Sequence, residues 1–481
     1  MDNKDTKGIS INKNENFSDW YTELIQKSEL GDYTDVSGCI VFRPRSYSIW
    51  EKIMDLVNQR IKKLGVKNVY FPLFIPEKFL LKESDHVKGF SPEVAWVTQA
   101  GDTKLKERLA VRPTSETIMY PSFSKWIRSY RDLPLKINQW SNVVRWEFKH
   151  PVPFFRTREF LFNEGHTVFA TKKEAEEEGP KIIAMYKEIL EDHMAIPSFF
   201  GKKTEKEKFA GAEYTLTLET YLPNGRAIQG PDFHHDGQIF SKAFDIKFLD
   251  ENGKEQYVYQ NTWAISTRML GIMFALHSDD KGLVLPPKLV DEKIGIVPII
   301  FEDSKKKVLA KAQEIKKMLN NYGAFIDDRE DYSPGWKFSE MELKGIPIRI
   351  EIGPKDLTKK QVIVVKRNTS QKKEVKISQL KKVIPQLLDE IQKELYKSAE
   401  KLMKDNIVSA NSFKDVLKLI NNNKIVLAPL CSNIECEDNL KDKTGGAKVL
   451  NIPPEQSNLK GKKCIICNKD ANYIAYIGKS Y

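Results

Sequence analysis

The stretch NVVRWEFKHPVPFFRTREFLF, residues 142–162, decides the fold that the sequence predicts. Two runs rich in β-branched and aromatic residues flank a return loop, so we expect strands over 142–148 and 160–168. Further strand-like runs lie at 214–221 and 243–248, and helical patterns lie at 116–130 and 174–194. Because the strands come in groups and the helices do not strictly alternate with them, the pattern predicts an α+β domain. Its antiparallel sheet would carry helices on its flanks, unlike a doubly wound fold.

The rest of the chain divides around this sheet. Toward the N-terminus, apolar residues at three- and four-residue spacings predict an amphipathic helix over 46–64, and the proline-broken run 66–76 predicts a strand that cannot pair along its whole length. Toward the C-terminus, the break GLVLPP at 282–287 precedes a compact α/β unit, and a charged helix over 378–404 leads to a cysteine-bearing tail. We therefore expect an α+β domain over 1–286, an α/β domain over 287–396 and a small α+β domain over 397–481.

The composition is that of a folded protein with a basic surface. Of 481 residues, 41% are hydrophobic and 30% charged, which excludes wholesale disorder. A net charge of +11 makes a polyanion a candidate partner, although a Lys-rich surface is more often simply solvated. No run reaches the ~18 consecutive apolar residues of a membrane span, and the N-terminus lacks the apolar core of a secretory signal. The predicted location is the cytoplasm, without membrane association.

Arginines beside the strand-like runs are the first candidates for chemistry. They are Arg145, Arg156, Arg158 and Arg268. An arginine in an apolar setting is costly to desolvate and usually faces an anion or a paired carboxylate. An internal ion pair would be favoured for any single arginine, but several among phenylalanines favour a nucleotide stacked on a ring. The chain has neither a GxxxxGK[ST] loop nor a GxGxxG run after a strand, so side chains would hold the phosphates.

Two polar stretches are further candidates for a site. In RPTSETIMYPSF, Thr114 and Glu116 are typical first of all of a helix N-terminus, and the alternative is that they hold a small cationic amine. His234 and His235 would point in opposite directions in a strand, so we expect one in the core and one facing a site.

The cysteines form two close pairs near the C-terminus. Cys431-x4-Cys436 and Cys464-x2-Cys467 are separated by 27 residues, a pattern typical of a tetrahedral four-cysteine zinc site. Two disulfides are the alternative, disfavoured in the cytosol. Four thiolates leave no coordination position for water, so the zinc would be structural.

The motifs together resemble a known family. Pro72 after the amphipathic helix, the RxE of Arg145 and Glu147, and Arg268 before an apolar helix resemble motifs 1, 2 and 3 of the class II aminoacyl-tRNA synthetases. The strings KGFSPEVAWVT, LAVRPTSE, NVVRWEFKHP, FFRTREFLF, NEGH and GLVLPP resemble prolyl-tRNA synthetases of the archaeal and eukaryotic type, over residues 17–481. The resemblance implies a class II catalytic domain, an anticodon-binding domain and a zinc-binding C-terminal domain.

The resemblance also implies a reaction and its residues. ATP and L-proline would form prolyl-adenylate with release of diphosphate, and the prolyl group would pass to tRNA(Pro) with release of AMP; Mg²⁺ would accompany the ATP. The implied catalytic residues are Arg145, Arg156 and Arg268, with Arg145 between the proline carboxylate and the α-phosphate. Those implied for ATP are Arg145, Glu147, Arg156, Phe160, Gln229, Ser266 and Arg268. Those implied for proline are Phe90, Thr114, Glu116, Arg145, Phe162 and His234.

Anticodon and partner assignments follow from the same resemblance. Phe338, Glu342, Arg349, Lys355 and Asp356 match positions that read the guanines of a proline anticodon; ion pairing along a sheet edge is the alternative. The family's C-terminal tyrosine, here Tyr481, is thought to reach back toward the catalytic domain. Because motif 1 builds the class II dimer interface, the resemblance implies a homodimer.

The sequence departs from the family in two places. Phe162 stands where tryptophan usually lines the proline pocket, and GPDF at 230–233 stands where small residues are usual, which puts the Asp232 carboxylate near a phosphate-binding face. Only 122 residues separate Arg145 from Arg268, too few for the large editing insertion of the bacterial type. We therefore expect no hydrolysis of mischarged alanyl-tRNA by this chain itself.

Two alternatives remain open at this point. A catalytically inactive paralogue that still binds tRNA is disfavoured because the motif arginines, Thr114 and Glu116 are all retained. A class II ligase for threonine, serine or histidine is the other alternative. A threonine enzyme would need an open metal position, whereas the only metal-type set in the sequence is the closed four-cysteine one.

Overall fold

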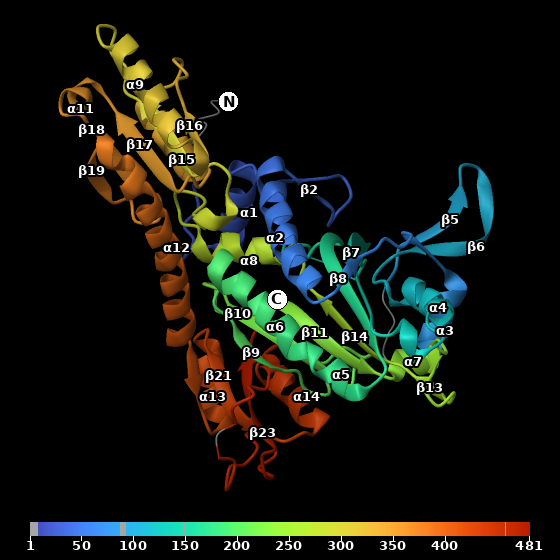
Figure 1. Ribbon diagram of the computed structural model, residues 1–481. Helices are drawn as coiled ribbons and strands as arrows, with labels where there is room; N and C mark the ends of the chain where they lie inside the picture. Colours follow the sequence, from blue (N-terminus) through green and yellow to red (C-terminus); the bar gives the residue numbers. More distant parts are fainter. Residues whose placement is uncertain (1–7, 87–92, 148–149, 457) are drawn as a thin grey trace.

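A seven-stranded sheet forms the centre of the first domain (Figure 1). The computed structural model describes residues 8–86, 93–147, 150–456 and 458–481. All neighbouring strands of the sheet are antiparallel except the first pair, so the predicted antiparallel sheet is confirmed. In spatial order the strands are β3 (Lys67–Asn68), β7 (Leu135–Val144), β8 (Glu159–Phe169), β14 (Tyr259–Ala264), β11 (Ala227–Gly237), β10 (Tyr214–Tyr221) and β9 (Phe199–Lys202).

Helices with an apolar stripe cover the sheet. The first is α2 (Pro44–Lys63), whose Ile49, Trp50, Ile53, Val57 and Ile61 are buried at three- and four-residue spacings. This face packs with α6 and α8 into the largest apolar core of the described residues. The remaining helices of the domain are α1 (Phe17–Lys27), α3 (Glu77–His86), α4 (Glu116–Trp126), α5 (Lys172–Glu176), α6 (Glu178–Glu188), α7 (Ile239–Ala243) and α8 (Arg268–His277).

Smaller sheets complete the first domain. A three-stranded sheet, which extends from the body in Figure 1, has the order β4-β6-β5, and two hairpins pair β1 with β2 and β12 with β13. Their bounds are β1 (Gly31–Tyr33), β2 (Ile40–Phe42), β4 (Phe74–Pro76), β5 (Trp96–Ala100), β6 (Thr103–Val111), β12 (Lys247–Leu249) and β13 (Glu255–Tyr257). The run 66–76 therefore holds two short strands in different sheets, consistent with the prolines that limit its pairing.

Three predicted elements differ from the structure. The strand predicted over 142–148 begins earlier and ends at Val144, and the helix predicted over 116–130 ends at Trp126. Of the strand predicted over 243–248, only Lys247 and Phe248 lie in a strand, β12, because the first residue closes helix α7. Phe240, Phe244 and Phe248 are all buried at four-residue spacing, which suits a helical turn leading into a short strand.

The second domain is the predicted α/β unit. Its five-stranded sheet has the order β16-β15-β17-β18-β19, in which β15 runs parallel to both of its neighbours and the other pairs are antiparallel. The strands are β15 (Ile294–Pro298), β16 (Ala324–Ile326), β17 (Ile348–Ile352), β18 (Gln361–Lys366) and β19 (Lys372–Lys376). The helices are α9 (Lys305–Met318), α10 (Pro334–Leu343) and α11 (Pro354–Thr358).

A long helix joins the second domain to the third. Helix α12 (Leu380–Asp405) runs along one side of the molecule and contacts α8 and β10 of the first domain on its way (Figure 1). The third domain is a small α+β unit with sheet order β20-β21-β23-β22. Its elements are β20 (Ile407–Ser409), α13 (Phe413–Asn421), β21 (Ile425–Leu430), α14 (Ile434–Lys443), β22 (Lys448–Asn451) and β23 (Tyr473–Gly478). Among the described helices, none has the length and apolar character needed to cross a membrane.

The chain ends against the first domain. The Tyr481 N–H donates to the carbonyl of Ala227, and its hydroxyl accepts from the side chain of Asn224 at 2.7 Å. Its ring stacks on Phe155 with 5.0 Å between centroids. Phe155 precedes Arg156 in the loop between β7 and β8, so the end of the chain supports that loop.

Candidate functional site

A cavity of about 700 Å³ lies on one face of the seven-stranded sheet. Strands β8, β11 and β14 form its floor, the segment before α4 and the loop 203–210 form its walls, and the start of α8 closes one end. Its volume lies within the range of small-molecule sites. The cavity brings together most of the residues that the sequence predicted, and its two halves differ in charge.

Arginines form one half of the cavity. Arg145, directly after β7, lines the wall, and its Nε donates to the carbonyl of Pro113 at 3.0 Å. Arg268, the first residue of α8, donates from Nε to the carbonyl of Phe155 at 3.1 Å. Arg156 is exposed and is not among the lining residues, but it lies near enough to Arg268 to affect that group's charge.

The arginine half is electrostatically unbalanced. Burial lowers the pKa of Arg268, and the positive charges of Arg145 and Arg156 lower it further. The negative charge of Asp232 acts in the opposite direction and raises this pKa. Guanidinium groups that repel one another in a partly buried site are stabilised by an anion between them. This half of the cavity is therefore suited to a polyanion such as a triphosphate.

Aromatic and polar side chains accompany the arginines. The guanidinium of Arg145 lies 5.4 Å from the ring centroid of Phe160, and Phe160 meets Phe162 edge-on at 5.6 Å. Glu147, Gln229 and Ser266 also line the cavity. Phe162 is 5% exposed and provides an apolar wall without a hydrogen-bond donor.

Carboxyl groups form the other half of the cavity. The Thr114 hydroxyl donates to Glu116 and lies 3.1 Å from Oε1 of Glu164, which also accepts from the Ser115 backbone N–H at 2.9 Å. Ser115 begins α4 without a side-chain capping bond of its own, so the Glu164 carboxylate serves the helix N-terminus. Glu116 is therefore free to face the cavity, and it is buried rather than turned outward as a surface cap.

The carboxyl half carries shifted pKa values. Burial, and then the charge of Glu116, raise the pKa of Glu164 to about 7. The same two causes raise the pKa of Asp236, which does not itself line the cavity, well above its ordinary value. Burial lowers the pKa of His166 to about 4, so this neighbouring imidazole is neutral near pH 7. Crowded carboxyl groups whose charge the Arg112 guanidinium only partly offsets favour a cationic ligand.

The sequence did not single out Glu164 or Asp236. Glu164 lies within the NEGH string and Asp236 follows the two histidines, so the available signal was a carboxylate inside an otherwise buried strand. Such a residue is costly to bury unless it has a partner.

The two histidines divide as expected. His235 is fully buried and contacts the side chain of Asn261, whereas His234 lines the cavity and its Nδ1 lies 2.8 Å from the Thr215 hydroxyl. Asp232 lies between the two halves: its carboxylate accepts from the Gln229 side chain at 2.8 Å and lies 3.6 Å from His234. The predicted proline residue Phe90 lies outside the described residues.

The lysine-rich loop 203–210 is a second feature that the sequence did not reveal. Lys203 forms a buried ion pair with Glu219 at 2.5 Å and donates to the carbonyl of Leu450 in the third domain at 2.7 Å. Thr204 donates to Glu437 at 2.9 Å, so the third domain holds this wall of the cavity from behind.

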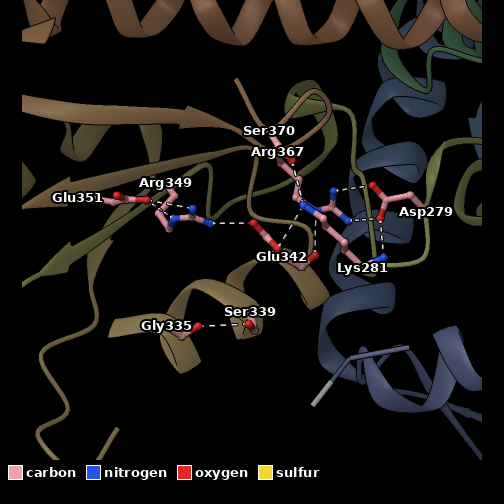
Figure 2. Close-up of polar contacts among 9 residues, drawn as sticks. All are labelled: Asp279, Lys281, Gly335, Ser339, Glu342, Arg349, Glu351, Arg367 and Ser370. Carbon is pink, nitrogen blue, oxygen red and sulfur yellow. Dashed lines mark hydrogen bonds and ion pairs between the residues drawn. The ribbon is translucent and has the colours of Figure 1, made fainter. Parts of the chain in front are cut away.

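Three of the five predicted anticodon residues, Phe338, Glu342 and Arg349, lie together in the second domain; Figure 2 shows Glu342 and Arg349. Arg349 donates to Glu342 at 3.2 Å and to Glu351 at 2.9 and 3.0 Å. Its guanidinium also lies 4.3 Å from the ring centroid of Phe338. Lys355 and Asp356 lie on α11, and no contact between described residues joins them to this cluster. Asp356 instead accepts from the N–H of Gly353 at 2.9 Å.

The four cysteines of the tail meet in the third domain. The sulfur atoms of Cys431, Cys436, Cys464 and Cys467 all lie within 4.8 Å of one another, and none of the four forms a disulfide. Zn–S bonds of ~2.3 Å at tetrahedral angles put the sulfurs about 3.8 Å apart. The set therefore fits a zinc ion, and the two-disulfide alternative finds no support.

Three protein families match successive parts of the chain. The class II core domain of tRNA synthetases (G, H, P, S and T) matches residues 96–277, the anticodon-binding domain matches 293–387, and the C-terminal domain of prolyl-tRNA synthetases matches 413–481. The fold and the cavity therefore belong to a class II aminoacyl-tRNA synthetase.

Similar proteins share nearly the whole chain. A putative proline–tRNA ligase of Saccharomyces cerevisiae is 46% identical over 98% of this chain and 73% of its own length. The cytoplasmic proline–tRNA ligase of Arabidopsis thaliana is 45% identical over 98% and 91%. The crystal structure of prolyl-tRNA synthetase from Cryptosporidium parvum with halofuginone and AMPPNP matches with a TM-score of 0.94 at 46% identity, over 98% and 99% of the two chains. This chain belongs to the prolyl-tRNA synthetase family, and the resemblance noted in the sequence is confirmed.

Proposed function

We propose that this protein ligates L-proline to tRNA(Pro) in two steps, through prolyl-adenylate. The single observation that carries the proposal is a cavity that joins an arginine half to a carboxyl half. A triphosphate suits the first half and a protonated secondary amine suits the second. The substrate carboxylate then lies between them, where it can attack the α-phosphate.

Side chains of the two halves bind different substrates. In this proposal Arg145 neutralises the charge that gathers as the proline carboxylate approaches the α-phosphate, and Arg156 and Arg268 hold the outer phosphates. Phe160 stacks on the adenine, while Glu147, Gln229 and Ser266 contact the nucleotide. Thr114 and Glu116 accept the two N–H groups of the proline ammonium, and Phe162 and His234 enclose its ring. No side chain forms a covalent intermediate, so catalysis is positioning and charge stabilisation.

Mg²⁺ and Zn²⁺ have different roles in this proposal. Mg²⁺ would accompany ATP and offset phosphate charge, and Glu147, which lines the cavity, would offer it a carboxylate oxygen of the kind it prefers. Cys431, Cys436, Cys464 and Cys467 would hold Zn²⁺, and its binding would stabilise the third domain, which in turn supports the loop 203–210.

Proline-dependent exchange of labelled diphosphate into ATP tests the first step. The purified protein should exchange with proline and far more slowly with alanine or threonine. Arg145→Ala should lower the exchange rate about 10²–10³-fold, because it removes a preorganised charge from the transition state. Exchange that needs no proline, or that survives both Arg145→Ala and Glu116→Ala, would contradict the proposal.

We further propose that the protein does not edit mischarged tRNA. The 122 residues between Arg145 and Arg268 contribute to the catalytic sheet, to its helices and to the cavity loop. Excluding the smaller alanine by packing alone is worth only ~1–3 kcal/mol, so discrimination needs a separate hydrolytic site. Rapid release of alanine from alanyl-tRNA(Pro) by the purified protein would contradict this.

A homodimer in the cytoplasm is the proposed working form. Strand β3 is an edge of the large sheet, and exposed aromatic side chains follow it in the chain: Tyr70, two residues after β3, and Phe74 on β4. Exposed aromatic residues beside an open edge suit a subunit interface. Light scattering should give twice the chain mass, and Tyr70→Asp should shift it toward the monomer. The name of the Arabidopsis relative supports the cytoplasm.

A further inference from the structure

Charged side chains link the first domain to the Phe338–Glu342–Arg349 cluster of the second domain; Figure 2 shows Asp279, Arg367, Glu342 and Arg349. Asp279 lies two residues after the end of α8, and its carboxylate accepts from both terminal nitrogens of Arg367, at 2.8 and 2.6 Å. The Arg367 side chain is 2% exposed. A bidentate pair with one buried partner fixes the relative position of its two segments.

Arg367 extends the link to the cluster. Its Nε donates to the backbone carbonyl of Glu342 at 2.9 Å, one residue before the end of α10. The side chain of Glu342 accepts from Arg349 at 3.2 Å. Arg367 thus holds the backbone of the residue whose carboxylate orients Arg349.

The backbone leaves little freedom at this junction. The Leu283 N–H donates to the carbonyl of Leu343 at 3.0 Å. Gly282 has a φ of +135°, and a Cβ there would lie 2.4 Å from the Cα of Leu343. Lys281 also faces the cluster, with Nζ 3.9 Å from the carboxylate of Glu342 and 3.2 Å from the Ser370 hydroxyl. The segment 279–283 is therefore seated directly on the end of α10.

The same segment is attached to the cavity through α8. This helix begins with Arg268 in the arginine half and ends at His277, and its residues from Met269 to Leu276 are buried. Ten residues of α-helix span about 15 Å, and a buried helix moves as a unit. The cluster is thus held against the far end of the helix that places Arg268.

We propose that Asp279 and Arg367 are positioning residues for anticodon recognition. They hold Glu342, and through it Arg349, in the orientation that meets the guanines of the anticodon, at a fixed position relative to the catalytic cavity. This inference rests on the proposed function, since it assigns a role in selecting the tRNA of that reaction. Asp279 and Arg367 touch no part of the cavity, so formation of the adenylate does not depend on them.

The decisive variant is Arg367→Lys. Lysine keeps the positive charge opposite Asp279. It lacks the planar guanidinium that donates at once to the Asp279 carboxylate and to the Glu342 carbonyl. We expect Arg367→Lys and Asp279→Asn to raise the KM for tRNA(Pro) about 5- to 100-fold, the usual size of coupling between sites. The kcat at saturating tRNA and the proline-dependent exchange rate should stay within about twofold of the wild type in this assay.

A second readout separates recognition from mere folding. The wild type should prefer tRNA(Pro) over a transcript in which one anticodon guanine is replaced, and Arg367→Lys should lose most of that preference. Lys52→Gln is the matched control, because Lys52 pairs with Asp291 across the same two domains at 2.5 Å and neither residue belongs to the cluster. It should leave the preference intact.

Three results would overturn the inference. An unchanged KM for tRNA and an unchanged anticodon preference in Arg367→Lys would overturn the inference, as would an equal loss of preference in Lys52→Gln. A parallel fall in exchange would overturn it too, because the residues would then serve the catalytic domain itself. If the wild type shows no proline-dependent exchange, the proposed function fails on its own account.

Discussion

The two halves of the cavity are built in opposite ways. The arginines are long side chains carried at the end of β7, in the loop before β8 and at the start of α8, and Arg156 is exposed. The carboxyl groups of Glu116 and Glu164 are buried, at the start of α4 and in strand β8. Hydroxyl and backbone donors hold Glu164 in place.

This difference shows how one cavity can accept two very different ligands. A flexible triphosphate needs charges that can follow it, which long side chains on loops provide. A rigid imino acid needs a preformed site, because little binding energy is available to reorganise a site for so small a ligand. Substitutions in the arginine half should therefore alter ATP parameters, and those in the carboxyl half should alter proline parameters.

The largest expected effect lies in the arginine half. Arg268→Ala should lower kcat/KM for ATP in proline-dependent exchange by about 10²–10³-fold, because it removes a half-buried charged donor from the phosphates. The KM for proline should change far less. Arg131→Ala, an arginine on the surface helix η1 (Tyr130–Asp132), is the control and should match the wild type. Equal damage to both substrates would mean that the two halves do not act separately.

The next effect lies in the carboxyl half. Glu116→Gln keeps the size of the side chain but removes its charge, and hydrogen bonds to charged groups contribute ~1.5–3 kcal/mol. The KM for proline should rise about 10- to 150-fold, with the KM for ATP nearly constant. Thr114→Ser, which keeps the hydroxyl, should have a small effect. A proline KM that Glu116→Gln leaves unaltered would assign Glu116 to the helix N-terminus alone.

Sequence reasoning predicted the arginine half better than the carboxyl half. Arg145 and Arg268 stand out because arginine is rare beside apolar strands, and the motif spacing fixes their order. Glu164 was missed because its role depends on β8 passing beside Ser115, a contact 49 residues apart in the chain. The third domain's support for Lys203 and Thr204 was missed for the same reason, since it joins segments more than 200 residues apart.

The fold, too, was predicted only where the local sequence pattern is clear. Predictions from local periodicity succeeded for α2, β10 and the antiparallel class of the sheet, where apolar residues follow one clear period. They failed at 243–246, where Phe244, at helical spacing from the buried Phe240, was interpreted as a strand residue. Packing of the second domain against α8 through Arg367 and Asp279 could not be seen at all, because ion pairs between domains leave no periodic signal.

A smaller effect concerns pH and Glu164. Because its pKa in the folded protein is about 7, the carboxyl is largely neutral at pH 6 and ionised at pH 8, beside Glu116 and partly offset by Arg112. An ionised Glu164 strengthens attraction for the proline ammonium, so the Kd for proline should fall by up to about tenfold between pH 6 and pH 8. Calorimetric titration measures this, and Glu164→Gln should flatten the dependence.

The stability of the protein without ligands should fall as the pH rises, whereas its affinity for proline should increase. Folding raises the pKa of the Glu164 carboxyl from 4.5 in the unfolded chain to about 7. The folded state therefore loses stability as the pH rises from 4.5 to about 7, because the unfolded chain gives up this proton more readily. The Tm of the protein without ligands should therefore decline over that window more steeply than the Tm of Glu164→Gln. A proline Kd in the wild type that does not vary with pH would show that Glu164 keeps one charge state throughout.

The smallest effect lies where the halves meet. Asp232 places a carboxylate beside Gln229 and opposes the effect of Arg145 on the pKa of Arg268, so it competes with phosphate for the same cations. Asp232→Ser should lower the KM for ATP about two- to fivefold, the scale of a partly screened charge. Asp389→Ser, which removes an exposed partner of Lys393 on α12, controls for the change in net charge. A higher KM for ATP in Asp232→Ser would mean that Asp232 assists the nucleotide, through Gln229 or through Mg²⁺, and that the boundary between the halves belongs to the ATP site.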